Sequence, residues 1–566
     1  MKRWLIFVFA VFVSASLLAN DAKLAPELRQ RASGQLVSVI VQYNATPGAI
    51  HEARIIGMSG HVNRRLRAAN AFAVQLPASV LTALSQDGDV AYITPDRPIH
   101  SHMNNAAPAV NAPYAWGLGL DGNGIGVALI DSGIHNGDDL KDANSQSRVV
   151  VSLDFVGGTG DDGYGHGTHV AGIIGGNAAD STCPNCTTAI RGVAPKVSLI
   201  NLRALDNNGE GSDSTVIAAI DAAIALKDLY NIRVINLSLG RPVWESYTLD
   251  PVCKAVEQAW KAGIVVVVSA GNDGRDNSLG TDGYFTIEAP GNDPYVITVG
   301  AMNSKGTPDR SDDVMTSYSS KGPTPIDYIV KPDVLAPGNR LVSLQEPGTL
   351  VQNYPQNRPY TSYYMQNGMF PRPSTSYFIL SGTSMATGVV SGAAALLLEQ
   401  DPTLTPDQVK ARLMKTAYKN LPTSTTIVDG STRTTYIVQS DGFTVGAGYL
   451  DIQAALSSTE RALGVAKSPA ATYDPASGEV FFLADSTSSW WQSALWSPSL
   501  VWGSNIFLSG DSGTWGSSAM WGNSAMWGNS AMWGNSAMWG NSAMWGNSAM
   551  WGNSAPWGDL AITGEN

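Results

Sequence analysis

At 566 residues the chain is longer than one ordinary domain, and its 44% hydrophobic content is enough for a large core. Its formal net charge of -12 is acidic, which argues against nucleic acid as a main partner because phosphate binding needs a basic face. An acidic chain that can form a large core suits a soluble extracellular protein.

Residues 1–20 have the pattern of a secretory signal peptide. Lys2 and Arg3 precede a mostly apolar run, and Ala15 and Ala19 are candidate cleavage sites. The alternative is a transmembrane anchor, but the run is shorter than the ~20 apolar residues that span a bilayer. No later segment is long and apolar enough to serve as an anchor. The sequence therefore predicts a secreted protein without a membrane span in its mature form.

Residues 22–105 are expected to form a small α+β unit. Its expected elements are two strands, a helix and a closing strand, over residues 36–43, 71–76, 79–86 and 90–94. We interpret the unit as a segment that is removed on maturation, with cleavage in the stretch 97–105. A permanent N-terminal domain is the alternative.

Apolar strands alternate with helical stretches between Asp131 and Gln400. The expected strands cover 197–205, 234–239, 264–271 and 296–302, and the expected helices cover 214–230, 251–262 and 384–399. This alternation predicts an α/β fold with a mainly parallel sheet and helices on both faces. Ligands bind at the carboxyl ends of the strands in such sheets, so residues at strand ends and helix starts are the candidates for a site.

Three segments place a carboxylate, an imidazole and a hydroxyl at such positions. The apolar strand over 126–130 ends in Asp131, His166 begins a helix in Gly-His-Gly-Thr-His, and Ser384 lies in Gly-Thr-Ser-Met-Ala at the start of another. A serine nucleophile needs a base to take its proton, and a buried carboxylate orients the imidazole that does so. Taken alone, Asp-Ser-Gly after a strand is usually only a turn. Together the segments predict catalysis by Asp131, His166 and Ser384.

A metal site is the alternative for the histidine pair. His166 and His169 lie three residues apart on one helical face. The zinc-protease pattern, however, requires His-Glu-x-x-His, and residue 167 is glycine. We therefore expect that the chemistry requires no cofactor.

The order Asp131, His166, Ser384, with these flanking segments, resembles that of the subtilisin-like serine proteases, the subtilase family. The resemblance covers residues 108–457. It implies a serine endopeptidase that cuts polypeptide substrates through an acyl-enzyme, with a subtilisin-like catalytic domain. It also implies that residues 22–105 are an inhibitory propeptide, which makes the chain's own propeptide a binding partner.

The resemblance implies further site residues. Asn272, after the strand over 264–271, is expected to donate to the oxyanion, although an asparagine there is otherwise an ordinary turn residue. Two segments would bind an extended peptide as an added strand, which predicts broad specificity. The expected substrate-binding residues are Gly209, Gly211, Ser238, Leu239, Gly240, Ala270 and Gly271. Structural calcium is common in the family, and Asp139 falls near where one ligand is expected, although surface aspartates are usually only solvated.

Gly388 departs from the family, which usually has proline there. Glycine costs up to about 1 kcal/mol relative to alanine inside a helix, so the helix after Ser384 is expected to be less rigid.

Cys183 and Cys186 lie in a polar loop, where an oxidising compartment favours a disulfide and a redox-active pair is the alternative.

Residues 458–485 are expected to be a linker, and residues 486–566 a repeat tail. The hexad Trp-Gly-Asn-Ser-Ala-Met recurs from Trp515 to Pro556 without a charged residue. Six residues advance about 600° around a helix, so the tryptophans would share no face, whereas in extended chain they keep one face. The period favours a β-solenoid, with a disordered low-complexity tail as the alternative. Clustered tryptophans would favour attachment to a cell wall, a polysaccharide or another protein.

Two functions of different class fit these patterns. The first is a secreted serine endopeptidase that is matured by propeptide removal and localised by its tail. The second is a surface or binding protein whose protease domain acts only in its own maturation. The intact set of Asp131, His166, Asn272 and Ser384 favours the first.

Overall fold

The structure is a computed structural model that describes residues 23–25, 28, 35–66, 70–95, 106–278, 280–366, 371–429, 432–474, 479–483 and 564–565. The predicted signal peptide, the predicted cleavage stretch 97–105 and the hexad repeats lie outside these residues, and the predictions for them stand as predictions. The chain divides into two units, Met1–His100 and Ser101–Asn566, and each is described by itself.

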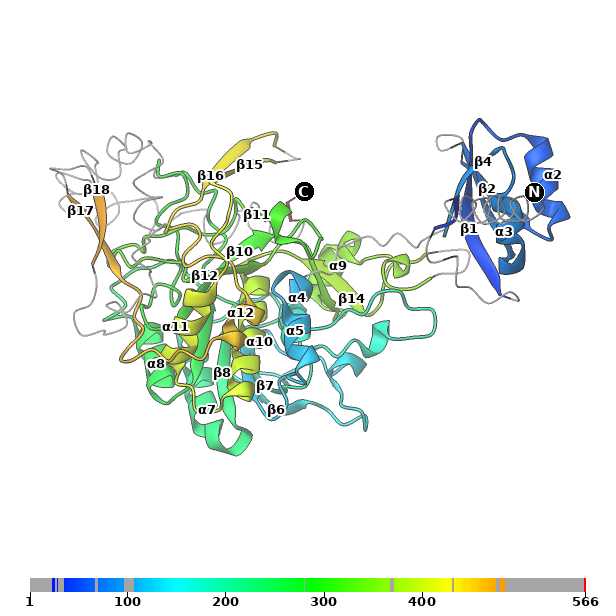
Figure 1. Cartoon of the computed structure of the whole chain (residues 1–566). Coiled ribbons are helices and arrows are strands. Elements are labelled where there is room, and N and C mark those ends of the chain that lie inside the picture. Colours follow the sequence, from blue (N-terminus) through cyan, green and yellow to red (C-terminus); the bar gives the residue numbers. More distant parts are fainter. Residues whose placement is uncertain are drawn as a thin grey trace, which may run out of the picture. The chain divides into compact units, whose positions relative to one another are not determined.

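The first unit contains a four-stranded antiparallel sheet with the strand order β2-β3-β1-β4 (Figure 1). Its elements are β1 (Leu36–Tyr43), α2 (Ala49–Gly57), β2 (His61–Leu66), β3 (Ala71–Pro77), α3 (Leu81–Ser85) and β4 (Val90–Pro95). Alternate residues of β1, from Val37 to Tyr43, are buried, as expected for a strand with one face on a core. The predicted strands and helix are therefore present, and α2 and β2 are additions to them.

The second unit is built on an eight-stranded sheet with the order β11-β10-β9-β8-β5-β7-β6, and β12 pairs with β10. The strands are β5 (Gly126–Asp131), β6 (Val149–Asp154), β7 (Ser198–Arg203), β8 (Ile232–Leu237), β9 (Val265–Ser269), β10 (Ile297–Asn303), β11 (Val314–Met315) and β12 (Val334–Pro337). Within the described residues, each pairing in this sheet is parallel except that of β10 with β11. The mainly parallel α/β fold predicted from the sequence is confirmed.

Helices cover the sheet of the second unit (Figure 1). The longer ones are α6 (His166–Gly175), α7 (Asp213–Tyr230), α8 (Pro251–Lys261), α10 (Thr383–Gln400) and α11 (Pro406–Thr416), and the shorter ones are α4 (Ala106–Ala109), α5 (Ala112–Gly117), α9 (Thr349–Asn353) and α12 (Ile452–Ser457). Every residue of β5, β9 and β10 is buried, which requires cover on both sides of these strands. None of the helices in the described ranges combines the length and apolar character needed to cross a bilayer.

Three two-stranded ribbons complete the second unit. They pair β13 (Leu341–Leu344) with β14 (Tyr377–Leu380), β15 (Ser424–Val428) with β16 (Thr435–Gln439), and β17 (Ala470–Asp474) with β18 (Glu479–Leu483). The β13–β14 ribbon leads directly into α10, because β14 ends three residues before that helix begins. The ribbon therefore positions the start of α10, where Ser384 lies.

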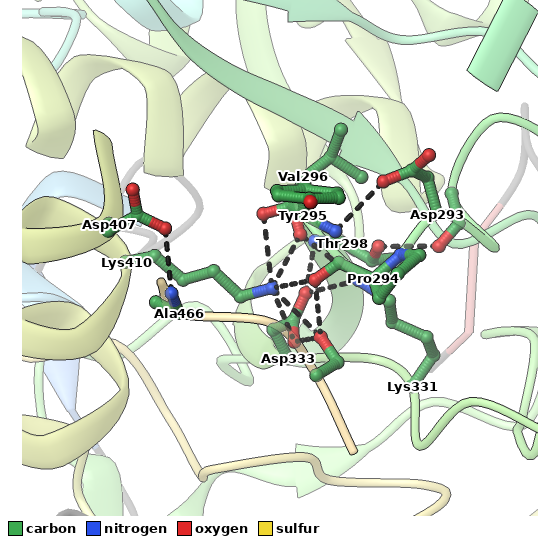
Figure 2. A network of polar contacts seen from close by, with 12 residues as sticks. Asp293, Pro294, Tyr295, Val296, Thr298, Lys331, Asp333, Asp407, Lys410 and Ala466 are labelled. Atoms are coloured by element: carbon green, nitrogen blue, oxygen red, sulfur yellow. Dashed lines mark hydrogen bonds and ion pairs between the residues drawn. The ribbon is translucent and has the colours of Figure 1, made fainter. Parts of the chain in front are cut away.

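A buried ionic cluster connects distant segments of the second unit (Figure 2). The Asp333 carboxylate lies 2.7 Å from Lys331 Nζ and 3.4 Å from Lys410 Nζ, and all three side chains are fully buried. Lys410 also donates to the carbonyl oxygens of Pro294 and Val296. Burial lowers the pKa of Lys410 to about 7, although the charge of Asp333 opposes this shift. The cluster holds the loop before β12 against α11.

Residues 458–474, which we expected to begin a linker, are in contact with this cluster and its surroundings. The hydroxyl of Ser468 donates to Asp333 and accepts from Lys410 Nζ. At the next residue, the Pro469 carbonyl accepts a hydrogen bond from the Val330 amide at 2.7 Å. Ordered packing thus continues past residue 457 and into β17.

Gly564 and Glu565 pack against earlier segments of the second unit, to which they belong. The Glu565 carboxylate accepts from the Ser317 amide at 3.0 Å and lies 2.8 Å from Arg275 Nη2. The Asn339 side chain binds both the amide and the carbonyl of Glu565, each at 2.7 Å. Glu565 is 5% exposed. This end of the tail segment is therefore buried and held by an ion pair and hydrogen bonds.

Candidate active site

Asp131 and His166, predicted as partners, are in direct contact. Asp131 is the last residue of β5 and His166 is the first residue of α6. His166 Nδ1 lies 2.8 Å from Asp131 Oδ1, and 18% of the histidine side chain is exposed while the aspartate is fully buried. Because an ionised carboxylate only accepts hydrogen bonds, the contact assigns the hydrogen to Nδ1 and leaves Nε2 with a free lone pair.

The charges around His166 favour its protonated form. Burial opposes a charged imidazolium, but the attraction and hydrogen bond of Asp131, together with the charge of Asp162, raise the pKa of His166 above its usual value. An imidazole in this setting can accept a proton from a neighbouring hydroxyl and hold it beside a carboxylate.

His169 is placed differently, in the interior between α6 and the β13–β14 ribbon. Its Nε2 lies 3.2 Å from the Leu341 carbonyl oxygen and 3.1 Å from that of Phe378. Desolvation lowers the pKa of His169 to about 3, so the ring is neutral. No three His, Cys, Asp or Glu side chains gather as a metal-binding group in the described parts of the chain. The arrangement does not fit the zinc alternative.

Helices α6 and α10 pack closely and run in the same direction. A Cβ atom built on Gly388 would lie 3.1 Å from Ile173 Cγ2 and 3.4 Å from Val170 Cγ1. One turn later in α10, a Cβ on Gly392 would lie 3.5 Å from the carbonyl oxygen of Ile174, the residue after Ile173. Glycine at 388, where the family usually has proline, therefore permits a close helix contact, which is a packing role that the sequence did not reveal.

Ser384 lies one turn before Gly388 in α10, and His166 lies one turn before Val170 in α6. The Ser384 hydroxyl donates to the Ser238 carbonyl oxygen at 3.2 Å. A serine side chain has three staggered rotamers, and this hydrogen bond selects the one that faces Ser238. The Ser384 hydroxyl thus lies in the first turn of α10, and its pairing with His166 stays a prediction.

Asn272 is bound to the main chain next to Ser384. Its Oδ1 accepts from the Thr383 amide at 2.9 Å, and only an amide oxygen can accept this bond, so Nδ2 is left as a donor. Gly382, with φ +146°, lies against the same side chain, and this backbone conformation favours glycine. The arrangement can place a hydrogen-bond donor where negative charge develops on an oxygen attacked by Ser384.

The predicted groove residues lie on both sides of α10's first turn. Ser238 Oγ donates to the Ser384 carbonyl oxygen at 2.8 Å and accepts from Asn236 Nδ2 at 2.9 Å. On the other side, the Gly271 amide donates to Thr383 Oγ1 at 3.3 Å. Segments 238–240 and 270–271, which follow β8 and β9, are therefore brought together beside the hydroxyl.

Gly209 and Gly211 belong to a turn that follows β7. The Asp206 amide donates to the Glu210 carbonyl at 2.7 Å, and Gly211 forms a β-bridge with Leu205. A Cβ on Gly209 would come within 2.6 Å of the Tyr164 ring, two residues before α6. The turn therefore lies beside the approach to α6, and its role as the opposite edge of a groove stays a prediction.

Asp162 and Ser132 were missed in the sequence, although they connect β5 to the start of α6. Ser132 Oγ donates to Asp162 at 2.8 Å and accepts from the Gly167 amide at 3.0 Å. Asp162 also accepts from the amides of Gly165 and Thr168, at 2.7 and 2.8 Å, and is 2% exposed. The available signal was an aspartate shortly before a helix, where it can bind free first-turn amides.

Asp139 and the cysteine pair lie away from Ser384. Asp139, expected as a calcium ligand, is buried, and its two oxygens accept from the Asp180 amide and the Tyr377 hydroxyl. Burial raises the pKa of Asp139 to about 6, and its role as a calcium ligand stays a prediction. Cys183 and Cys186 are joined by a disulfide.

Comparison with known proteins agrees with this geometry. The profile described as "Subtilase family" matches residues 122–448. Serine protease AprX of Bacillus subtilis (strain 168) is 34% identical over 350 residues, which cover 60% of this chain and 71% of the relative. Subtilisin E of Bacillus subtilis (strain 168) is 31% identical over 462 residues, which cover 80% and 98%.

A third relative comes from another genus. The extracellular serine proteinase of Thermus sp. (strain Rt41A) is 34% identical over 388 residues, which cover 65% of this chain and 76% of the relative. The family profile spans more than half of the chain and includes the segments that carry Asp131, His166 and Ser384. The chain therefore belongs to the subtilase family of serine-type endopeptidases.

Proposed function

We propose that the chain is a secreted endopeptidase in which Ser384 is the nucleophile, His166 the general base, Asp131 the orienting carboxylate and Asn272 the oxyanion donor. The observation that carries this assignment is the 2.8 Å contact of His166 Nδ1 with Asp131 Oδ1 at the start of α6, a helix that packs against the Ser384 helix α10. An imidazole with its tautomer fixed by a buried carboxylate is the base that a serine nucleophile needs.

Proton transfer then follows from the positions of these groups. His166 Nε2 takes the Ser384 proton as the oxygen attacks the substrate carbonyl, and the imidazolium is stabilised by Asp131. Asn272 Nδ2 donates to the oxygen that becomes negative. The imidazolium protonates the leaving amine, and water, deprotonated by His166, hydrolyses the acyl-enzyme. Apart from the substrate and water, the proposed steps involve only side chains of this protein.

An extended substrate would lie between the segments 238–240 and 209–211. Main-chain hydrogen bonds along such an added strand provide affinity that is independent of the substrate's side chains. We assign Ser238, Leu239, Gly240, Ala270 and Gly271 to one wall, and Gly209 and Gly211 to the opposite edge.

The test of this function is the variant Ser384→Ala. It should abolish hydrolysis of peptide substrates and leave residues 22–105 attached, as measured by chromogenic assay and by mass spectrometry of the purified protein. Ser457→Ala, which changes an exposed serine at the end of α12, is the matched control and should retain both activities. Hydrolysis by Ser384→Ala would refute the assignment.

Secretion and maturation belong to the same proposal. Support comes from the signal-like segment 1–20, from the separate α+β unit, and from the name of the Thermus relative as extracellular. A mature protein that begins after the stretch 97–105 is the expected result of N-terminal sequencing. Retention of residues 22–105 in the active secreted protein would favour a permanent domain instead.

We also propose that the hexad tail attaches the enzyme to a cell wall or polysaccharide. Deletion of residues 486–562 removes the repeats but keeps Gly564 and Glu565. This variant should cut soluble peptides as before and bind less to insoluble cell walls in a pull-down assay. Equal binding would reject attachment. Self-trimming without hydrolysis of any added peptide would favour the alternative of a surface protein.

A further inference from the structure

Glu288 lies between the two segments that form the proposed wall of the substrate groove. A Cβ on Gly240 would collide with Glu288 Oε2, and a Cβ on Gly271 would lie 2.8 Å from Glu288 Cγ. The Glu288 amide donates to the Ala270 carbonyl at 3.1 Å, so its backbone is fixed to this wall. The two glycines leave the space that the glutamate side chain occupies.

In the described ranges, no residue forms an ion pair or hydrogen bond with the Glu288 carboxylate, and burial is the one cause of its raised pKa. The backbone next to it pairs with Arg241, whose amide donates to the Ala289 carbonyl at 3.0 Å. The Arg241 guanidinium, however, binds Asp213 at 2.8 Å and Asp250 at 2.9 Å. The Arg241 guanidinium, although its backbone pairs with the residue next to Glu288, is therefore already bound to two other carboxylates.

A second carboxylate lies close to the first. Asp273 directly follows Asn272, and burial together with the charge of Glu288 raises the pKa of Asp273 to about 8. Burial likewise raises the pKa of Glu288 to about 7. Two partly buried carboxylates without a cation are costly, and a cation placed between them would relieve that cost.

We propose that the Glu288 pocket, formed by Gly240, Gly271 and Glu288 with Asp273 nearby, binds the Lys or Arg side chain of the substrate residue before the scissile bond. This inference rests on the proposed function, because Ser384 must hold the scissile carbonyl beside the pocket. A guanidinium or ammonium group that reaches the Glu288 carboxylate from the groove supplies the donors that Glu288 lacks. The enzyme would then be selective for basic substrate residues before the scissile bond, instead of having the broad specificity expected from the sequence.

The experiment compares peptides that differ only in the residue before the cut, which is Arg, Lys, Leu or Phe. In the unmodified enzyme, kcat/KM should be higher for Arg and Lys than for Leu and Phe. Glu288→Gln keeps the size and removes the charge, and should lower the Arg-to-Leu ratio of kcat/KM by about ten- to a hundredfold. Rates are expressed per active site, counted with a covalent serine inhibitor.

Glu257→Gln is the matched control, because Glu257 is a glutamate on α8 that pairs with Lys261 at 2.6 Å. Its Arg-to-Leu ratio should equal that of the unmodified enzyme. A ratio that is unchanged in Glu288→Gln, or an unmodified enzyme that prefers Leu or Phe, would overturn the proposal. The proposed function would survive either result, since it fails only if Ser384→Ala retains hydrolysis.

A measurement on the unmodified enzyme covers the case in which Glu288→Gln does not fold. Benzamidine, a small cation with the planar charge of a guanidinium, should inhibit hydrolysis of the Leu peptide competitively, whereas neutral benzamide should not. Equal inhibition by both compounds, or by neither, would contradict a cation-binding pocket.

Discussion

The substitution Asp162→Asn tests whether the loop before α6 holds the candidate active site together. The Asp162 carboxylate accepts from Ser132 Oγ and from the Gly165 and Thr168 amides, at 2.7 to 2.8 Å. Asparagine keeps one oxygen and places an NH2 group against one of these donors, so a buried donor loses its acceptor. That loss costs ~1–3 kcal/mol, and the remaining bonds weaken because they no longer end on a charge. We expect a loss of ~2–5 kcal/mol in the free energy of unfolding.

Denaturant unfolding in the Ser384→Ala background, where self-digestion is prevented, measures this loss. Asp161→Asn is the control, because Asp161 is exposed and receives a hydrogen bond only from Thr159 among the described residues; its effect should stay within about 0.5 kcal/mol. A loss for Asp162→Asn as small as that of the control would refute the reasoning.

The same substitution, with Ser384 intact, has a second expected effect, on the pH profile. The charge of Asp162 contributes to the raised pKa of His166, and the base must be neutral to act. Removal of that charge lowers the pKa, so the acidic limb of kcat/KM against pH should move to lower pH. A limb that stays in place, or moves to higher pH, would show that Asp162 does not act on the imidazole.

Two further predictions concern residues away from the reaction. The folded pKa of His169 is about 3 and the unfolded value about 6.5, so between these values the unfolded chain binds the extra proton and stability falls as pH falls, by about 1.4 kcal/mol per unit. His169→Gln should flatten this decline in urea midpoints measured from pH 7 to 4, and parallel curves would contradict it. Glu565→Gln removes a charge that is paired with Arg275 at 2.8 Å. Since Arg275 keeps Asp429 at 2.6 Å, we expect a loss of only ~1–3 kcal/mol, visible as a lower melting temperature, and an unchanged melting temperature would mean that the contact contributes nothing.

The sequence was informative where chemistry is encoded in consecutive residues. Asp131, His166 and Ser384 each lie in a short segment whose neighbours define a strand end or a helix start, and the structure brings Asp131 and His166 into contact. The strands and helices of the second unit follow the expected ranges because buried parallel strands read as continuous apolar runs.

The roles of residues whose contacts come from distant parts of the sequence were not predictable in this way. Glu288 is separated from Asn272 by a loop with no periodic pattern, and only the pairing of its backbone with Ala270 places it at the groove. Gly388 looked like a weak point in a helix, because its partners Val170 and Ile173 lie in a distant segment. A single sequence does not reveal such contacts.

The parallel register of α6 and α10 has an electrostatic consequence. Each helix carries about half a positive elementary charge at its N-terminus, and His166 and Ser384 lie in the first turns of α6 and α10. Their combined field favours an anion on a substrate oxygen and disfavours a charged imidazole. Asp131 and Asp162 therefore do more than orient groups, since their negative charges allow His166 to become an imidazolium within a field that favours the oxyanion.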